Sequence, residues 1–207
     1  VEKMKVCTCL NPLHTSLAVF GCLLGYTKIS DEMKDDTLKK LVERVGYEEG
    51  LPVVVNPGVI DPKEFIDTVI NVRIPNPFMP DTSQKLAIRF GETIKAYMQS
   101  DKLDVSELKL IPLVYAGWLR YLMAVDDEGR QFELSPDPLL DTVCPYAAKL
   151  KLMAEQDVET VVEPILHMEN IFGVDLYEAG LSELVCSYLK ELTSGVHAVR
   201  NTLVKYV

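Results

Sequence analysis

The stretch that decides the fold is residues 11–26, which read NPLHTSLAVFGCLLGY. Asn11 and Pro12 form a typical helix entry, because an Asn side chain can cap free backbone N–H groups and proline suits the first helical position. The apolar residues that then recur every three or four positions include Leu13, Leu17, Phe20 and Leu24. This period predicts a central, largely buried helix from Asn11 to about Tyr26, in which Gly21 and Gly25 allow close contacts.

Further helices are predicted along the rest of the chain. They run from Asp36, as the cap, to Gly46; from Asp61 and Pro62 through Ile70; from Ser83 through Tyr97; from Val105 through Leu122; in two or three pieces between 138 and 167; and from Leu176 to Tyr206. Pro112 is expected to kink its helix, and Gly195 to interrupt the last one. These segments predict one all-α domain over residues 1–207.

Few segments favour other structures. Three prolines within residues 74–81 break any helix there. Residues 5–10 and 53–55 are the only plausible extended pieces. No Gly-rich fingerprint follows a strand and opens a helix, so neither a dinucleotide fold nor a phosphate-binding loop is expected in this chain.

Composition excludes several classes of function. The chain has 31 acidic and 21 basic residues, for a formal net charge of −10, with both signs interleaved. A nucleic-acid or anionic-membrane surface is therefore not expected. The longest apolar run, residues 17–26, is too short to span a bilayer, so no membrane-spanning segment is expected, and nothing in the sequence predicts a signal peptide. The five cysteines have no disulfide-framework spacing, which favours reduced thiols in a cytoplasmic protein.

The densest polar cluster comprises Lys5, Asn11 and His14. Asn11 and His14 are three apart and so share one face at the helix entrance, which Lys5 could reach from an extended lead-in segment. These residue types suit the interconversion of an alcohol and a ketone, because a lysine can take the alcohol proton while an amide stabilises the oxyanion. Histidine would hold a substrate hydroxyl. The alternative is that these residues have no catalytic role: Asn11 would be an ordinary helix cap, Lys5 a solvated lysine and His14 a structural histidine.

Two blocks resemble the polyol-specific long-chain dehydrogenases. Residues 5–21, KVCTCLNPLHTSLAVFG, resemble that family's lysine, asparagine and histidine signature opening an Ala/Leu/Gly-rich helix. Residues 73–77, RIPNP, leading to DTSQKLAIRF at residues 81–90, resemble its second block. The likeness in layout runs over most of the chain and is closest to the mannonate oxidoreductase (fructuronate reductase) branch.

The resemblance implies a two-domain enzyme that needs no metal. Its N-terminal Rossmann half, absent from this chain, would bind NAD, with NADP left open, and residues 1–207 would form a helical C-terminal half similar to that of 6-phosphogluconate dehydrogenase. This half would close over D-mannonate or D-fructuronate, or over mannitol or fructose, and would be inactive alone. The resemblance makes Lys5 the acid/base, Asn11 part of the oxyanion site, and His14 and Lys85 substrate contacts.

The chain departs from the family pattern at two places. Five residues, not four, separate Lys5 from Asn11, and Lys3 is a poorer match to the catalytic lysine. The region between Asp81 and Lys85 is shorter than in the family. The family also has a substrate-binding arginine before the lysine that Lys85 matches, and that arginine is missing here.

Other assignments stay open beside this one. Cys7, Cys9 and His14 include suitable zinc ligands but lack a second ligand pair at structural spacing. A helical interaction module without enzymatic activity would let Lys5, Asn11 and His14 diverge. A sugar-phosphate enzyme such as mannitol-1-phosphate 5-dehydrogenase would need a basic phosphate pocket, of which the sequence gives no clear sign. The remaining polar and aromatic candidates, expected to be structural, core or surface residues, are His167, His197, Trp118 and Tyr115.

Overall fold

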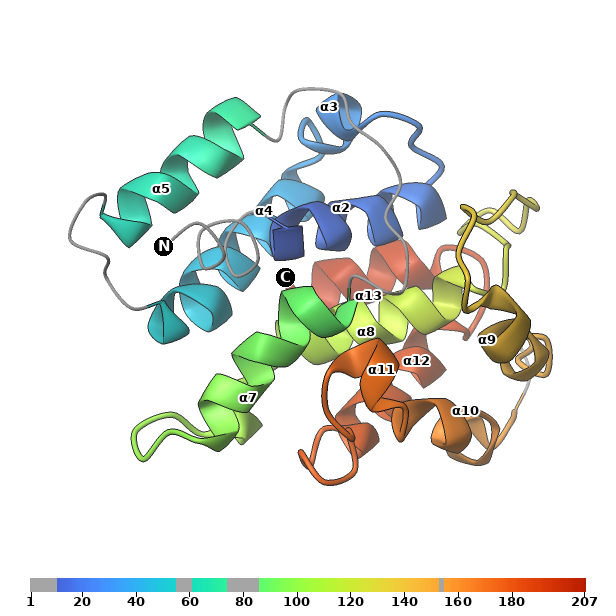
Figure 1. Ribbon diagram of the computed structural model, residues 1–207. Coiled ribbons are helices and arrows are strands. Elements are labelled where there is room, and N and C mark those ends of the chain that lie inside the picture. The colour runs from blue at the N-terminus through green and yellow to red at the C-terminus, as the bar shows by residue number, and fades with distance from the viewer. Residues whose placement is uncertain (1–10, 55–60, 74–85, 153–154) are drawn as a thin grey trace.

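The computed structural model describes residues 11–54, 61–73, 86–152 and 155–207, and these ranges are mainly helical (Figure 1). In chain order the α-helices are α2 (Asn11–Leu23), α3 (Ile29–Glu32), α4 (Asp36–Arg44), α5 (Pro62–Thr68), α7 (Glu92–Met98), α8 (Leu110–Tyr121), α9 (Leu140–Ala147), α10 (Val158–Leu166), α11 (Glu169–Phe172), α12 (Ser182–Leu192) and α13 (Ala198–Tyr206). Within the described ranges the pairing of β type is an isolated bridge between Val125 and Gln131. The all-α prediction is therefore confirmed.

Five shorter helical segments complete this part of the chain. Two are 3₁₀ turns, η3 (Leu51–Val53) and η6 (Val105–Glu107), and three are π-helical, η2 (Val45–Gly50), η4 (Val69–Arg73) and η5 (Ala87–Gly91). Of the extended piece expected at residues 53–55, the prediction is wrong for Val53, which closes the η3 turn, whereas Val54 has an extended backbone and residue 55 lies outside the described residues. The other extended piece, residues 5–10, lies outside the described residues.

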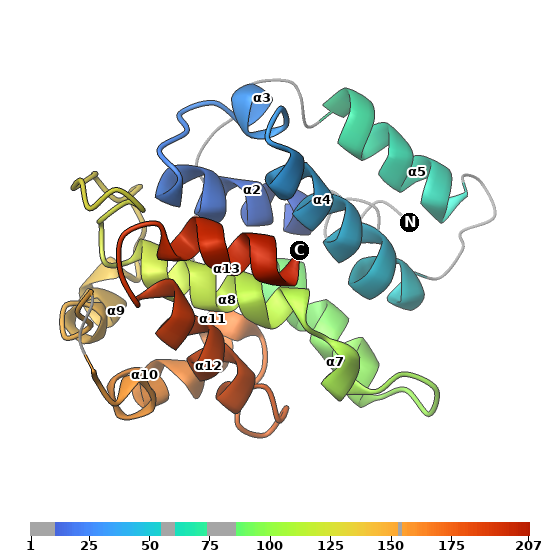
Figure 2. The ribbon, with the colours of Figure 1, turned by 180° about the vertical axis from the view of Figure 1, so that it is seen from behind.

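Helix α8 forms the centre of the fold. All of its residues are buried, and α2 and α12 both pack against it, while α13 lies alongside in both views (Figures 1 and 2). At the crossing of α2 and α8, Gly117 leaves room for the ring of Phe20, with which a side chain at position 117 would collide. The absence of a side chain at Gly117 therefore sets how closely α2 approaches α8.

The prediction that the first helix is central and buried is confirmed. Nine of the thirteen residues of α2 are buried, among them Leu13, Leu17 and Phe20. Gly21 does allow a close contact, with the Glu32 side chain of α3. Gly25 has another use: it lies beyond the helix with a φ of 80°, a left-handed conformation that glycine adopts without strain.

Helix α4 differs from the prediction at both ends. Its cap is Asp35 rather than Asp36, because the Asp35 carboxylate accepts hydrogen bonds from the backbone N–H groups of Thr37 and Leu38. The helix also does not end at Gly46, since the chain continues as the π-helical segment η2. Gly46 instead packs against Leu13 and Ile66, so its missing side chain serves packing.

Helix α8 begins at Leu110 because a remote carboxylate caps it. Glu49 of η2 is buried and accepts hydrogen bonds from the backbone N–H groups of Lys109, Leu110 and Ile111 at 2.6–2.7 Å. Pro112 thus falls in the first turn, where a missing N–H costs little. The expected kink at Pro112 is wrong, because residues 105–107 form a separate 3₁₀ turn rather than the start of this helix.

The C-terminal part follows the predicted order of helices. Two helices, α9 and α10, lie between 138 and 167, and the last pair, α12 and α13, is interrupted near Gly195. Asp127 caps α13 by accepting hydrogen bonds from the N–H groups of Val199 and Arg200. In the described part of the chain, no helix has both the length and the apolar character needed to cross a membrane.

Candidate active site at the start of helix α2

Asn11 and His14 lie together in the first turn of α2, as their spacing predicts. Both side chains are half-buried, whereas Leu13 between them faces the core against Gly46. Residues three apart are neighbours on a helix surface. The turn therefore presents an amide and an imidazole side by side, while its apolar residues hold it to the rest of the protein.

Arg89 of η5 is a third member of this site that the sequence analysis did not single out. Its side chain is buried, and its Nη1 donates a hydrogen bond to the Thr15 hydroxyl. The Thr15 Oγ1 in turn donates to the backbone carbonyl of Asn11 at 3.1 Å. The one available sequence signal was an arginine set directly before the apolar Phe90 in a helical run, which marks a charge that must find a buried partner.

The electrostatic environment favours an uncharged His14. Burial of the imidazole, and secondarily the positive charge of Arg89, lower the pKa of His14 below its usual value. Neutral imidazole can donate at one ring nitrogen and accept at the other. At neutral pH the start of α2 thus offers hydrogen-bonding groups suited to hydroxyl and carbonyl oxygens.

The position of Arg89 depends on how η5 packs. Gly91, at the end of η5, lies against the carbonyl of Phe172 and the backbone of Gly173, where a side chain would collide. Phe90 is fully buried and meets the ring of Tyr115 edge-on. Single π-helical turns shift the side chains that follow them and occur often at functional sites. Here such a turn carries the arginine that reaches α2.

Two predicted site residues lie outside the described part of the chain. Lys5 precedes Asn11, the first described residue, and Lys85 directly precedes Leu86, where the description resumes. Their expected roles as base and substrate contact remain predictions. The same holds for the alternative zinc site, because Cys7 and Cys9 also lie outside these ranges.

The other candidates have structural or surface roles, as expected. Tyr115 and Trp118 belong to the core of α8. His167 is paired with Asp175 at 2.7 Å, and His197 with Glu128 at 3.1 Å. Among the described residues, no group of three or more His, Cys, Asp or Glu side chains could hold a metal ion.

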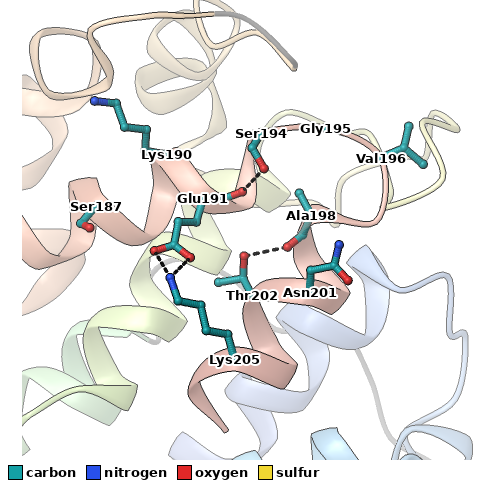
Figure 3. A pocket seen from close by; sticks show the side chains of 10 residues that line it. All are labelled: Ser187, Lys190, Glu191, Ser194, Gly195, Val196, Ala198, Asn201, Thr202 and Lys205. Atoms are coloured by element: carbon teal, nitrogen blue, oxygen red, sulfur yellow. Dashed lines mark hydrogen bonds and ion pairs between the residues drawn. The ribbon is translucent and has the colours of Figure 1, made fainter.

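A surface pocket between α12 and α13 shares no residue with the start of α2 (Figure 3). Its polar groups bind one another: Glu191 pairs with Lys205 at 2.9 Å, and Ser194 donates to the Glu191 carbonyl. Thr202 likewise donates to the carbonyl of Ala198. Hydrogen bonds within the protein thus occupy much of the pocket's polar lining, and the pocket lacks the amide and imidazole pair found on α2.

Comparison with known sequences identifies a family. The mannitol dehydrogenase C-terminal domain family matches residues 1–193. The D-mannonate oxidoreductase of Thermotoga maritima is 56% identical to this chain over 214 residues, which cover 100% of the chain and 40% of that relative. The chain therefore spans about 40% of the length of this relative.

Solved structures show the same fold. The Pseudomonas fluorescens mannitol 2-dehydrogenase, in a ternary complex with NAD and D-mannitol, matches 99% of this chain and 40% of its own with a TM-score of 0.81 at 21% identity. A substrate-free D-sorbitol dehydrogenase matches 95% of this chain and 40% of its own with a TM-score of 0.73 at 24% identity. In both cases the likeness covers nearly all of this chain and 40% of a longer chain.

Proposed function

The chain belongs to the mannitol dehydrogenase C-terminal domain family, and from this we propose that it is the substrate-binding and catalytic domain of an NAD-dependent oxidoreductase. The proposed reaction interconverts a secondary alcohol of a sugar acid or sugar alcohol with its ketone. The observation that carries the proposal is the 56% identity to a D-mannonate oxidoreductase over the whole chain. The pairing of Asn11 and His14 beside a buried arginine supports it, because these groups suit a polyhydroxylated substrate.

D-mannonate and D-fructuronate are the substrates we favour. The identity to the D-mannonate oxidoreductase is far higher than the 26% found for the mannitol 2-dehydrogenase of Emericella nidulans. Mannitol and fructose are the runner-up pair, since the fold is shared with a mannitol 2-dehydrogenase. A sugar phosphate is the less favoured substrate, because the interleaved charges of the sequence give no clear sign of a basic phosphate pocket.

The residues of this chain would divide the proton chemistry among them. In the oxidation direction, the Lys5 amine accepts the proton of the substrate hydroxyl as the carbonyl forms. The Asn11 amide donates a hydrogen bond to that same oxygen and stabilises its negative charge. His14, kept neutral, binds an adjacent hydroxyl, and Lys85 contributes a further substrate contact. In the reduction direction Lys5 returns the proton.

The cofactor would be held mainly outside this chain. Bound NAD supplies the hydride acceptor, but the sequence has no Gly-rich turn of the kind that binds a dinucleotide. Because the relative is longer, we propose that its remaining part corresponds to a Rossmann domain that binds NAD and meets the start of α2. We also propose a cytoplasmic location, since Cys22, Cys144 and Cys186 are free thiols.

The test is an assay of the longer protein that contains this chain. NADH oxidation is measured with D-fructuronate, D-fructose and a fructose phosphate as substrates. We expect kcat/KM to be highest with D-fructuronate and lower with NADPH than with NADH. Highest activity with fructose would move the enzyme to the mannitol dehydrogenases, and no activity with any of the three would refute the proposed function.

A further inference from the structure

Arg89 is connected to both described site residues, yet the mechanism above gives it no role. Its side chain is only 7% exposed, and it donates a hydrogen bond to Thr15. Thr15 directly follows His14 in α2, and its hydroxyl donates to the carbonyl of Asn11. The guanidinium is thus linked to the backbone of Asn11 through the Thr15 hydroxyl, and Thr15 is the immediate neighbour of His14.

We propose that Arg89 is a positioning residue, which fixes the first turn of α2 through Thr15 and sets the electrostatic environment in which His14 meets the substrate. The inference rests on the proposed function, because it concerns how His14 binds a sugar hydroxyl. A neutral imidazole can accept a hydrogen bond from that hydroxyl, whereas an imidazolium can only donate. A fixed cation beside His14 disfavours the second positive charge.

Other charged groups do not replace Arg89 in this role. Helix α2 packs against α3, α4, α8, η2 and η5, and within the described ranges Arg89 is the charged group that acts on the pKa of His14. The charged residues on the other four elements are Asp31 and Glu32 on α3, Asp36, Lys39, Lys40, Glu43 and Arg44 on α4, Glu48 and Glu49 on η2, and Arg120 on α8. Removal of Arg89 should therefore have a specific effect on His14.

The direct test is a titration of the histidine rings followed by NMR. The 207-residue chain has only three histidines, so that His14 is assigned by comparison with H14Q, and His167 and His197 serve as internal controls. In the wild-type chain we expect His14 to titrate below its usual pKa. In R89M its pKa should rise, because the Arg89 charge is lost while the burial that is the larger cause of the lowering remains, whereas R89K, which keeps the charge, should leave the pKa close to that of wild type.

A second pair of variants tests the anchor without removing the charge. Thr15 is buried, and T15V preserves its shape but removes the hydroxyl, while T15S keeps the hydroxyl. In the longer enzyme we expect T15V to lower kcat about ten- to a hundredfold, because small displacements of site residues cost that much. T15S should stay within about threefold of wild type, and NADH affinity should not change in either variant.

The pH profile links the two tests. With Arg89 removed, His14 becomes protonated at a higher pH, so the acid limb of kcat/KM should move upward in R89M. An unchanged His14 pKa in R89M with the His167 and His197 signals in place would overturn the proposal. If R89M does not fold, equal activity of T15V and T15S would overturn it. A wild-type enzyme inactive on every sugar would refute the proposed function alone, since the NMR result stands without turnover.

Discussion

The carboxyl group of Glu32 lies against the backbone of Gly21, in the space that a side chain at position 21 would occupy. Glu32 is 3% exposed, and its Oε2 has no hydrogen-bond partner. Burial, and secondarily the negative charge of Asp31, raise the pKa of Glu32 to about 7. Helix α3 is thus held against α2 by a side chain that is well accommodated only when protonated.

The stability of the protein should therefore fall as pH rises toward neutrality. A carboxyl with a pKa of about 4.5 unfolded and about 7 folded binds more protons in the folded state between those values. Its contribution is intact below pH 4.5 and is lost by pH 7, a difference of about 3 kcal/mol. E32Q should remove this dependence on pH. In urea unfolding from pH 4.5 to 8, the free energy of unfolding of E32Q should exceed that of wild type most at pH 8. The exposed E107Q is the control, and parallel curves for wild type and E32Q would contradict the prediction.

Glu49→Gln should destabilise the protein by about 2–3 kcal/mol, because one of the two carboxylate oxygens that accept backbone N–H groups becomes an amide donor. Urea unfolding at a single pH measures this change. The neighbouring Glu48 forms an ion pair with Arg44 at the surface, so E48Q should cost less than about 1 kcal/mol. Equal losses in the two variants would mean that Glu49 does not hold the start of α8.

Lys5→Ala in the longer enzyme should lower kcat at least about a hundredfold, because general-base groups contribute that much to a proton transfer. NADH affinity should be nearly unchanged. Lys3→Ala is the matched control, since Lys3 is the nearest alternative lysine in the sequence. If K3A lost activity and K5A did not, Lys3 rather than Lys5 would be the base, and the assignment of Lys5 across five residues from Asn11 would be wrong.

Lys85→Ala should act mainly on substrate binding. We expect KM for the sugar acid to rise about tenfold or more with a smaller change in kcat, because the proposed role of Lys85 is a substrate contact rather than a part in the proton transfer. Steady-state kinetics with Lys63→Ala, an exposed lysine on α5, provides the comparison. A loss confined to kcat would instead place Lys85 at the reacting carbon.

The 207-residue chain alone should not bind NADH or turn over mannonate, fructuronate or mannitol. It lacks the dinucleotide-binding fingerprint, and it spans about 40% of the Thermotoga maritima relative. Calorimetric titration with NADH, beside the longer protein as a positive control, measures this. Tight binding to the chain alone would show that the cofactor site lies within these residues.

Local signals in the sequence predicted the elements that depend on neighbouring residues. The entry at Asp61 with Pro62 begins a helix as expected, and Asp61 does cap α5. The residue before Asn11 lies outside the described part of the chain, so the cap predicted at Asn11 stays a prediction. The misplaced cap of α4 reflects two adjacent aspartates, either of which could have been chosen. Such choices are settled by which carboxylate the tertiary structure holds in place, as Arg200 does for Asp35.

Contacts between distant residues could not be predicted in this way. Glu49 caps a helix 61 residues further along the chain, and Arg89 reaches back 74 residues to Thr15. No local sequence pattern marks these contacts of Glu49 and Arg89. A buried charge needs a partner, but the sequence does not say which residue that partner is. The π-helical turn that carries Arg89 likewise depends on the packing of Gly91 against Phe172. The resemblance to a family identified Asn11 and His14, whereas the structure added the arginine beside them.

The insertion of Phe20 against Gly117 constrains how the domain can move. With the ring seated where a side chain would otherwise be, α2 cannot slide along α8 without lifting off it, so shear between these helices is blocked. Because α8 also packs against α12, we expect α2, α8 and α12 to move together. We therefore expect any opening and closing to be a hinge motion at the edge of the helical domain, in which the first turn of α2 keeps its geometry.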